Sequence, residues 1–190
     1  MSKAVLLSIQ PKWCELIASG QKTVEVRKTR PKLETPFKCY IYCTKDRWYK
    51  DNKNQTHYGY GKVIGEFVCD KVDCYPFVED EDEIGMIYPV STAEGEKTCL
   101  EYGEVEKYGS GKPLYFWHIS DLVIYDRPKE LYEFYRKCEN MACEGCEHLK
   151  YQRVNAKEYD YDCEYFGYKI PITRPPQSWC YVEELRWSDA

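Results

Sequence analysis

The chain has 190 residues, which is enough for one domain, or for one domain with a small appendage. Its mean hydropathy is −0.69, and no apolar run approaches the ~18 residues that a membrane-spanning helix needs. We therefore expect no membrane partner. The amino terminus has one lysine, a short apolar stretch and no small-residue cleavage site, so we expect a cytoplasmic protein in a reducing compartment.

Charge is distributed unevenly along the sequence. The net charge is −5, which argues against a generic nucleic-acid-binding protein. Residues 1–65, however, hold 13 Lys and Arg against 5 Asp and Glu, whereas residues 66–190 hold 14 against 27. The basic first third can form a local positive surface while the acidic remainder keeps the protein soluble. Alternatively, the acidic residues neutralise that surface in the folded chain.

The amino-terminal part predicts a strand, a short helix and a second strand. Pro11 suits the first turn of a helix, because its missing N–H needs no partner there. Gly20 suits the position after a helix, where it adopts the left-handed conformation without strain. Trp13, Leu16 and Ile17 mark the buried side of the helix. We expect these elements at Ala4–Ile9, Pro11–Ser19 and Thr23–Lys28.

The second of these strands alternates apolar and polar residues. Val24 and Val26 point to one face, and Thr23, Glu25 and Arg27 point to the other. One interpretation is a solvated strand face with a structural ion pair, which is common in sheets. The other is a functional site, because an acid and a base stand on one face just after a tight turn.

Later segments predict further short strands and helices around a long polar loop at residues 44–61. Thr98 and Glu101 have the spacing of a capping box, so we expect a helix from Thr98 to near Gly109. Another helix is expected at Lys129–Lys137, after Pro128. Strands are expected at residues 37–43, 62–74 and 179–184, and one or two strands at residues 113–125. This order predicts an α+β fold, built as a small mixed β-barrel with two or three covering helices.

The 11 cysteines include one group with the spacing of a zinc site. Two thiolates close in sequence bind one ion from a tight turn, and a distant residue completes the tetrahedron. The other cysteines stand among apolar residues and are expected to act as small hydrophobic residues. Free thiols or a redox role are alternatives for the group. The predicted structural zinc is held by Cys138, Cys143, Cys146 and Cys163, with His148 as an alternative ligand.

These cysteines define a predicted insert, so we expect a barrel domain at residues 1–137 and 171–190 and a cysteine-rich insert at 138–170.

The stretch from Gly20 to Arg27, with Lys22 and Glu25 between them, resembles the G-x-K-x-x-E-x-R motif of the ASCH family (activating signal cointegrator homology). Weaker similarity to bacterial and phage-associated members covers residues 3–128 and 171–184. The resemblance implies a PUA-like β-barrel, a cleft in which the three charged motif residues meet, and a role in binding RNA.

RNA recognition requires cationic groups for phosphates and aromatic surfaces for bases. The basic first third of the chain supplies both. We therefore predict an RNA- or nucleotide-binding module with a basic cleft built on the turn and strand from Gly20 to Arg27. The expected binding residues are Lys22, Glu25, Arg27, Lys28, Lys45, Arg47 and Arg174.

Two other functions stay open. Some ASCH-like proteins are amidohydrolases that use a lysine of this turn with a threonine three residues later. Lys22 matches that lysine, but Glu25 occupies the threonine position, and a carboxylate does not replace a hydroxyl nucleophile. One alternative is therefore a hydrolase that acts on RNA or a modified nucleoside, with Lys22 and Glu25 as its central residues. We favour the interpretation that the protein is not an enzyme. The third hypothesis is a protein-interaction scaffold whose acidic part docks an unidentified basic partner.

Overall fold

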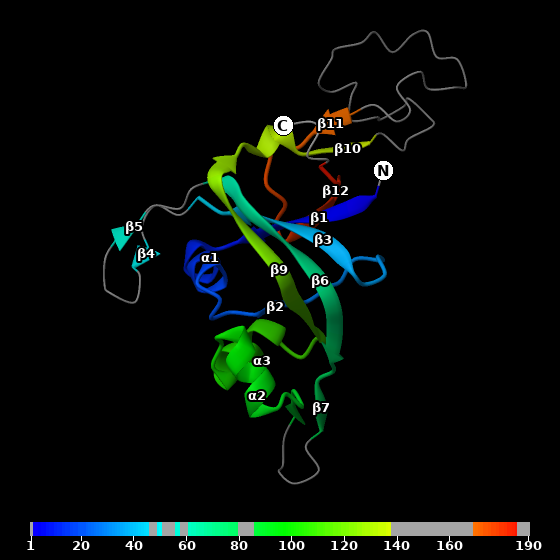
Figure 1. The fold of residues 1–190 in the computed structure, drawn as a ribbon. Helices are drawn as coiled ribbons and strands as arrows, with labels where there is room; N and C mark the ends of the chain where they lie inside the picture. Colours follow the sequence, from blue (N-terminus) through cyan, green and yellow to red (C-terminus); the bar gives the residue numbers. More distant parts are fainter. Residues whose placement is uncertain are drawn as a thin grey trace, which may run out of the picture.

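The computed structural model describes residues 2–45, 61–79, 87–137 and 169–185, and the backbone alone at residues 49–50, 56–57 and 86 (Figure 1). Its helices are α1 (Pro11–Ala18), α2 (Thr92–Thr98) and α3 (Tyr102–Gly109), with the 3-10 helix η1 (Leu131–Glu133). Its strands are β1 (Lys3–Ile9), β2 (Val24–Arg27), β3 (Phe37–Cys43), β4 (Tyr49–Lys50), β5 (Thr56–His57), β6 (Lys62–Tyr75), β7 (Val78–Glu79), β8 (Met86–Ile87), β9 (Leu114–Lys129), β10 (Tyr135–Lys137), β11 (Lys169–Pro171) and β12 (Trp179–Glu183).

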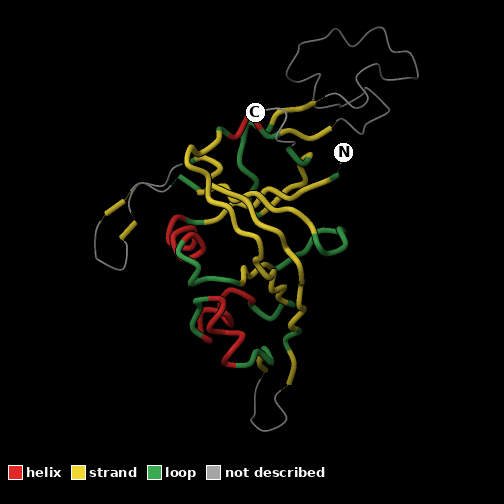
Figure 2. The backbone as a smooth tube through the Cα atoms, viewed as in Figure 1, coloured by secondary structure: helices red, strands yellow, loops and turns green. Residues whose placement is uncertain are grey.

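Six of the strands form one mixed sheet in the order β12-β1-β3-β6-β9-β2. β1 pairs in parallel with β3, and the other neighbours are antiparallel. β6 and β9, with 14 and 16 residues, cross the molecule diagonally in Figure 2. The helices α1, α2 and α3 lie on one side of this diagonal (Figure 2). The chain therefore combines an α+β composition with a single main sheet.

The sheet is open, so the prediction of a closed β-barrel is wrong. In the described part of the chain, the edge strands β2 and β12 share no backbone pairing. β2 has only four residues, and among the described strands it pairs with β9 alone, so it offers few backbone groups for a second partner. Side chains join the two edges instead. The indole N–H of Trp179 donates to the hydroxyl of Thr29 at 2.9 Å, and Arg27 donates to the carbonyl of Ser178 at 3.4 Å.

Both faces of the sheet are covered, because different elements pack on each of them. Along β1 the side chains alternate: Val5 and Leu7 enter one apolar core with α1, and Ala4 and Leu6 enter a second core. The second core also receives Phe134, which follows η1. A third apolar cluster joins α3 to β2 and β9. β1 is consequently buried on both faces, which explains its continuous apolar sequence.

Two of the predicted helices are corrected by the structure. Residues 129–137 hold the end of β9, η1 and β10, because Phe134 is fully buried against Tyr40 and β10 pairs with β11. The capping box is formed by Glu101 and Glu104 and begins α3, whereas Ser91 caps the start of α2. Tertiary contacts and a different cap residue therefore decide these boundaries.

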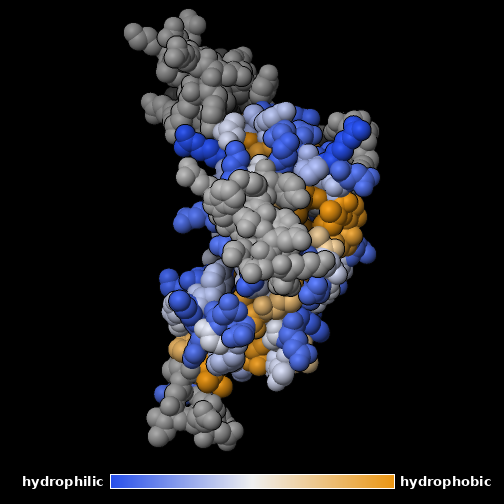
Figure 3. Space-filling view, turned by 90° about the vertical axis from the view of Figure 1, so that its left-hand side faces the viewer, coloured by the Kyte–Doolittle hydropathy of each residue, from blue (hydrophilic) through white to orange (hydrophobic). Residues whose placement is uncertain are grey.

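None of the helices in the described ranges is long and apolar enough to cross a membrane. On the side of α1–α3, Figure 3 shows hydrophilic residues over much of the described surface, with hydrophobic patches between them.

The described residues contain no group of three or more His, Cys, Asp or Glu that could hold a metal ion, and they give the metal-binding prediction no support. The predicted ligands lie outside the described residues. Zinc analysis of protein purified without chelator would test them: Cys138, Cys143, Cys146, Cys163 and His148.

Candidate functional site

The turn between α1 and β2 folds as its sequence predicts. α1 begins at Pro11, and Gly20, with a φ of +75°, follows its end. The backbone N–H of Lys22 then donates to the carbonyl of Leu16 at 2.9 Å. This turn reverses the chain and directs the side chain of Lys22 inward, where only 2% of the residue is exposed.

Lys22, Glu25 and Arg27 form one buried charge group. The Lys22 Nζ atom lies 3.4 Å from Glu25 Oε2, and Arg27 Nη2 lies 3.0 Å from Glu25 Oε1. Glu25 and Arg27 are 6% and 7% exposed. The three side chains meet, as the motif implies, but they are paired with one another below the surface. The strand face that sequence alternation suggested to be solvated is thus covered.

The buried charge group also binds three segments that are distant in sequence. Lys22 Nζ donates to the carbonyl of Thr98, at the end of α2, at 2.7 Å. Arg27 Nη2 donates to the carbonyl of Ser8 on β1 at 2.8 Å, and its Nη1 donates to the Ser178 hydroxyl at 3.3 Å. Arg27 Nε has no hydrogen-bond partner within the described ranges. The group therefore fixes β2 against α2, β1 and the start of β12.

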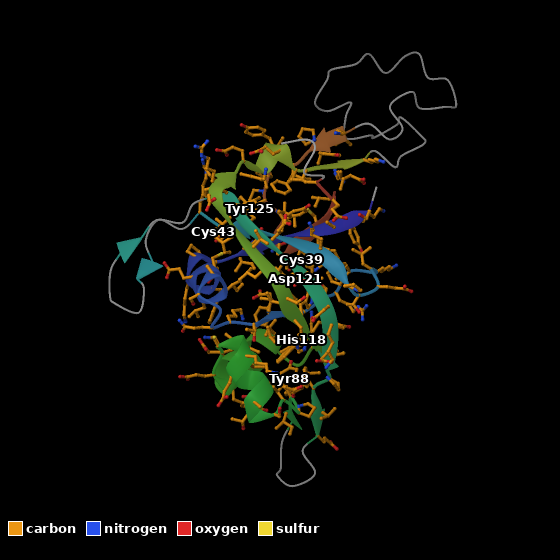
Figure 4. The ribbon with its side chains drawn as sticks, viewed as in Figure 1. Cys39, Cys43, Tyr88, His118, Asp121 and Tyr125 are labelled. Atoms are coloured by element: carbon orange, nitrogen blue, oxygen red, sulfur yellow. The ribbon has the colours of Figure 1, made fainter. Side chains whose placement is uncertain are left out.

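Buried thiols lie beside the charge group. Cys14 and Cys43 (Cys43 is labelled in Figure 4) are 3% and 1% exposed. The pKa of the Cys14 thiol is well above its ordinary value, because the thiol hydrogen-bonds to Cys43, is buried, and feels the negative charge of Glu25. A thiol with a raised pKa stays protonated and is a poor nucleophile. This agrees with the prediction that these two cysteines act as small hydrophobic residues.

Two aromatic rings flank the buried charge group. Lys22 Nζ lies 5.2 Å from the ring centre of Trp13 on α1, and Lys12 Nζ lies over the same ring at 4.3 Å. In a second contact, Lys28 Nζ lies 5.0 Å from the ring centre of Tyr108 on α3. The pKa of Tyr108 is raised by burial, and it also responds to the charges of Arg27 and Glu25. We call the four surface residues the Trp13–Tyr108 surface: Lys12, Trp13, Lys28 and Tyr108.

The sequence found only part of this surface. Lys28 was expected as a binding residue, and Trp13 was assigned to the buried side of α1. Lys12 could have been identified from the sequence, because it is a cation that directly precedes the aromatic residue Trp13 at the start of the predicted helix. Tyr108 carried none, because it is brought to β2 only by the packing of α3.

The other expected binding residues lie elsewhere. Lys45 follows β3 and lines a pocket with a volume of about 590 Å³. Arg174 is exposed and stands between Thr173 and Pro175, which line the same pocket. Arg47 lies outside the described residues. The structure thus separates the expected set into a buried group, a flanking surface and a pocket.

His118 has a partner that the sequence did not reveal. Its Nε2 atom lies 2.7 Å from Asp73 Oδ2, which is also 2.8 Å from Lys71 Nζ (His118 is labelled in Figure 4). Burial alone would raise the pKa of the Asp73 carboxyl, but hydrogen bonds from Lys71 and His118 lower it below its ordinary value. Because β6 and β9 pair in this region, the contact between His118 and Asp73 links the two strands.

Comparison with known proteins shows the family to which this chain belongs. The ASCH domain family matches residues 7–163, and this chain belongs to it. Its fold is consistent with the PUA-like superfamily. No curated protein matches the chain. Among solved structures, the ASCH protein of Zymomonas mobilis is similar, with 19% identity, a TM-score of 0.55 and coverage of 98% of this chain and 90% of that one. A tyrosine-to-phenylalanine mutant of that protein is similar too, with 18% identity, a TM-score of 0.56 and coverage of 96% of this chain and 92% of that one. At this identity the likeness concerns the fold.

Proposed function

We propose that this ASCH-domain protein binds RNA or a nucleotide, and that the Trp13–Tyr108 surface takes part in binding. The observation that carries the proposal is the pair of cation-on-ring contacts beside the buried charge group: Lys12 with Trp13, and Lys28 with Tyr108. Lysines neutralise phosphates, and partly exposed rings stack with bases. Both kinds of group stand here on elements of the ASCH motif or packed against it.

The buried charge group supports this surface from below. It contains two cations and one carboxylate, so it adds a net positive charge close to both rings. Lys22 Nζ lies over the ring of Trp13, and Arg27 and Glu25 lie near Tyr108. A positive potential beneath a partly exposed aromatic surface favours a polyanion over a neutral ligand. The motif residues thus contribute through charge and positioning.

The test compares a double variant with a matched control. Lys12→Ala with Lys28→Ala removes both surface cations of the proposed site. Lys169→Ala removes a lysine from an equivalent contact, in which Lys169 Nζ lies 4.4 Å from the ring centre of Tyr135. Binding of a fluorescent single-stranded RNA is measured by anisotropy at several salt concentrations. The double variant is expected to bind more weakly, with the slope of log K against log salt reduced by about 1.4.

The outcomes separate the three hypotheses. Equal loss in the control variant would refute the proposed surface, because it would show only a general effect of charge. No binding of RNA or nucleotides at low salt would favour the scaffold hypothesis. Shortened RNA or a converted modified nucleoside in the same samples, absent with Lys22→Ala, would favour the hydrolase hypothesis.

A further inference from the structure

A pocket at the ends of β1 and β3 is a feature that the proposed surface does not use. It is bounded by η1 and the segment before β12. We infer that this pocket binds one nucleotide, either free or as one unit of an RNA strand. The inference rests on the proposed function and adds a separate subsite. We call it the Lys45 pocket: Ser8, Tyr42, Thr44, Lys45, Gly61, Glu130, Leu131, Tyr132, Ile172, Thr173, Pro175, Pro176 and Gln177.

The size and walls of the pocket suit a planar ring. Its volume is about 590 Å³, within the usual range of ~300–1,000 Å³ for small-molecule sites. Leu131, Ile172 and Pro175 provide apolar wall. Tyr132 is 66% exposed, the highest value among the exposed large hydrophobic residues in the described chain. An accessible tyrosine beside an apolar wall is a suitable partner for a stacked base.

The charge of the pocket suits a single phosphate. Its carboxylate, Glu130, is neutralised by Lys62, whose Nζ lies 2.8 Å from Glu130 Oε1. Lys45 is exposed and makes no ion pair with any residue that the structure describes. Among the described residues, the pocket therefore keeps one cation without a carboxylate partner, and Arg174 lies between two lining residues in the sequence, Thr173 and Pro175. One phosphate against one or two cations is the charge balance of a nucleoside monophosphate.

The position of Lys45 is built into the fold. Gly61 has a φ of +62°, and a Cβ atom there would lie 2.4 Å from both Cγ and Cε of Lys45. The lysine stem therefore packs across a site that only glycine leaves open. Thr44 and Gln177 add polar side chains that can recognise sugar or base. Gly61 thus leaves the space in which the stem of Lys45 packs, and this packing sets the direction of the Lys45 side chain.

The pocket is also linked to the buried charge group. The carbonyl of Ser8, a lining residue, accepts the hydrogen bond from Arg27, and the Ser8 hydroxyl donates to the Pro176 carbonyl at 2.6 Å. The motif arginine thus holds the strand and the segment that form the pocket wall. A role of Arg27 in positioning this wall follows from these contacts.

The experiment uses the full chain and isothermal titration with adenosine monophosphate, uridine monophosphate, adenosine and inorganic phosphate, together with RNA anisotropy. Lys45→Ala is expected to weaken nucleotide binding by about tenfold, which is the effect of losing one charge-assisted contact. Gly61→Ala is expected to weaken it by displacing Lys45, and Tyr132→Ala by removing the ring. Lys169→Ala, which removes a lysine outside both sites, is expected to leave it unchanged.

Each result bears on the inference. Monophosphate binding that Lys45→Ala weakens supports a site for free nucleotides. If only RNA binds, and both Lys45→Ala and Tyr132→Ala weaken it, the pocket holds one unit of a strand. Phosphate binding as tight as the monophosphates, or no effect of Lys45→Ala and Tyr132→Ala in either assay, would overturn the inference. RNA binding that depends on Lys45 but not on Lys12 and Lys28 would instead refute the proposed surface and keep the pocket.

Discussion

Replacing Glu25 by glutamine removes the negative charge that Lys22 and Arg27 share. Both cations lie within 3.4 Å of its carboxylate, and all three residues are at most 7% exposed. The variant keeps the shape of the side chain but leaves two buried positive charges without a counter-ion. Breaking a buried ion pair in this way costs about 3–5 kcal/mol. For a chain of this size, the melting temperature is expected to fall by roughly 6–20 °C.

Urea unfolding followed by circular dichroism measures this loss, and Glu34→Gln is the matched control. Glu34 is exposed, so its substitution is expected to change the free energy of unfolding by less than about 0.5 kcal/mol. A loss of under ~1 kcal/mol for Glu25→Gln, with unchanged denaturant dependence, would contradict the burial and pairing of the charge group.

Two more predictions concern α3 and the pair between β6 and β9. Gly109→Ala is expected to destabilise strongly, because a Cβ atom would lie 1.9 Å from the hydroxyl of Tyr88. Gly103→Ala in the same helix, where nothing lies within 4 Å, is expected to stabilise by about 0.5–1 kcal/mol, and urea unfolding separates the two. The lowered pKa of Asp73 predicts that its contact with His118 and Lys71 stabilises the fold above the ordinary carboxyl pKa, and that this contribution is lost as pH falls through the folded-state value. The stability difference between wild type and Asp73→Asn should therefore shrink on acidification; a difference that is constant from neutral to acid pH would contradict it.

Local patterns predicted the elements that local forces form. The Pro11 and Gly20 signals placed α1 within one residue of its observed end, and the alternation after Gly20 placed β2. Closure of the sheet could not be obtained in this way, because it depends on pairing between strands far apart in the chain. The helix expected near residue 134 failed for a similar reason: burial of Phe134 against Tyr40 outweighs the local preference.

The sequence by itself determined that Glu25 and Arg27 share one face of β2, because strand residues alternate, and the resemblance to the ASCH motif implied that Lys22 meets them. Only the tertiary structure decided that they are buried. Alternation fixes the face on which a side chain lies, but it carries no information on what covers that face. Here the cover comes from Ser8, Thr98 and Ser178, which meet over β2 only after the chain has folded.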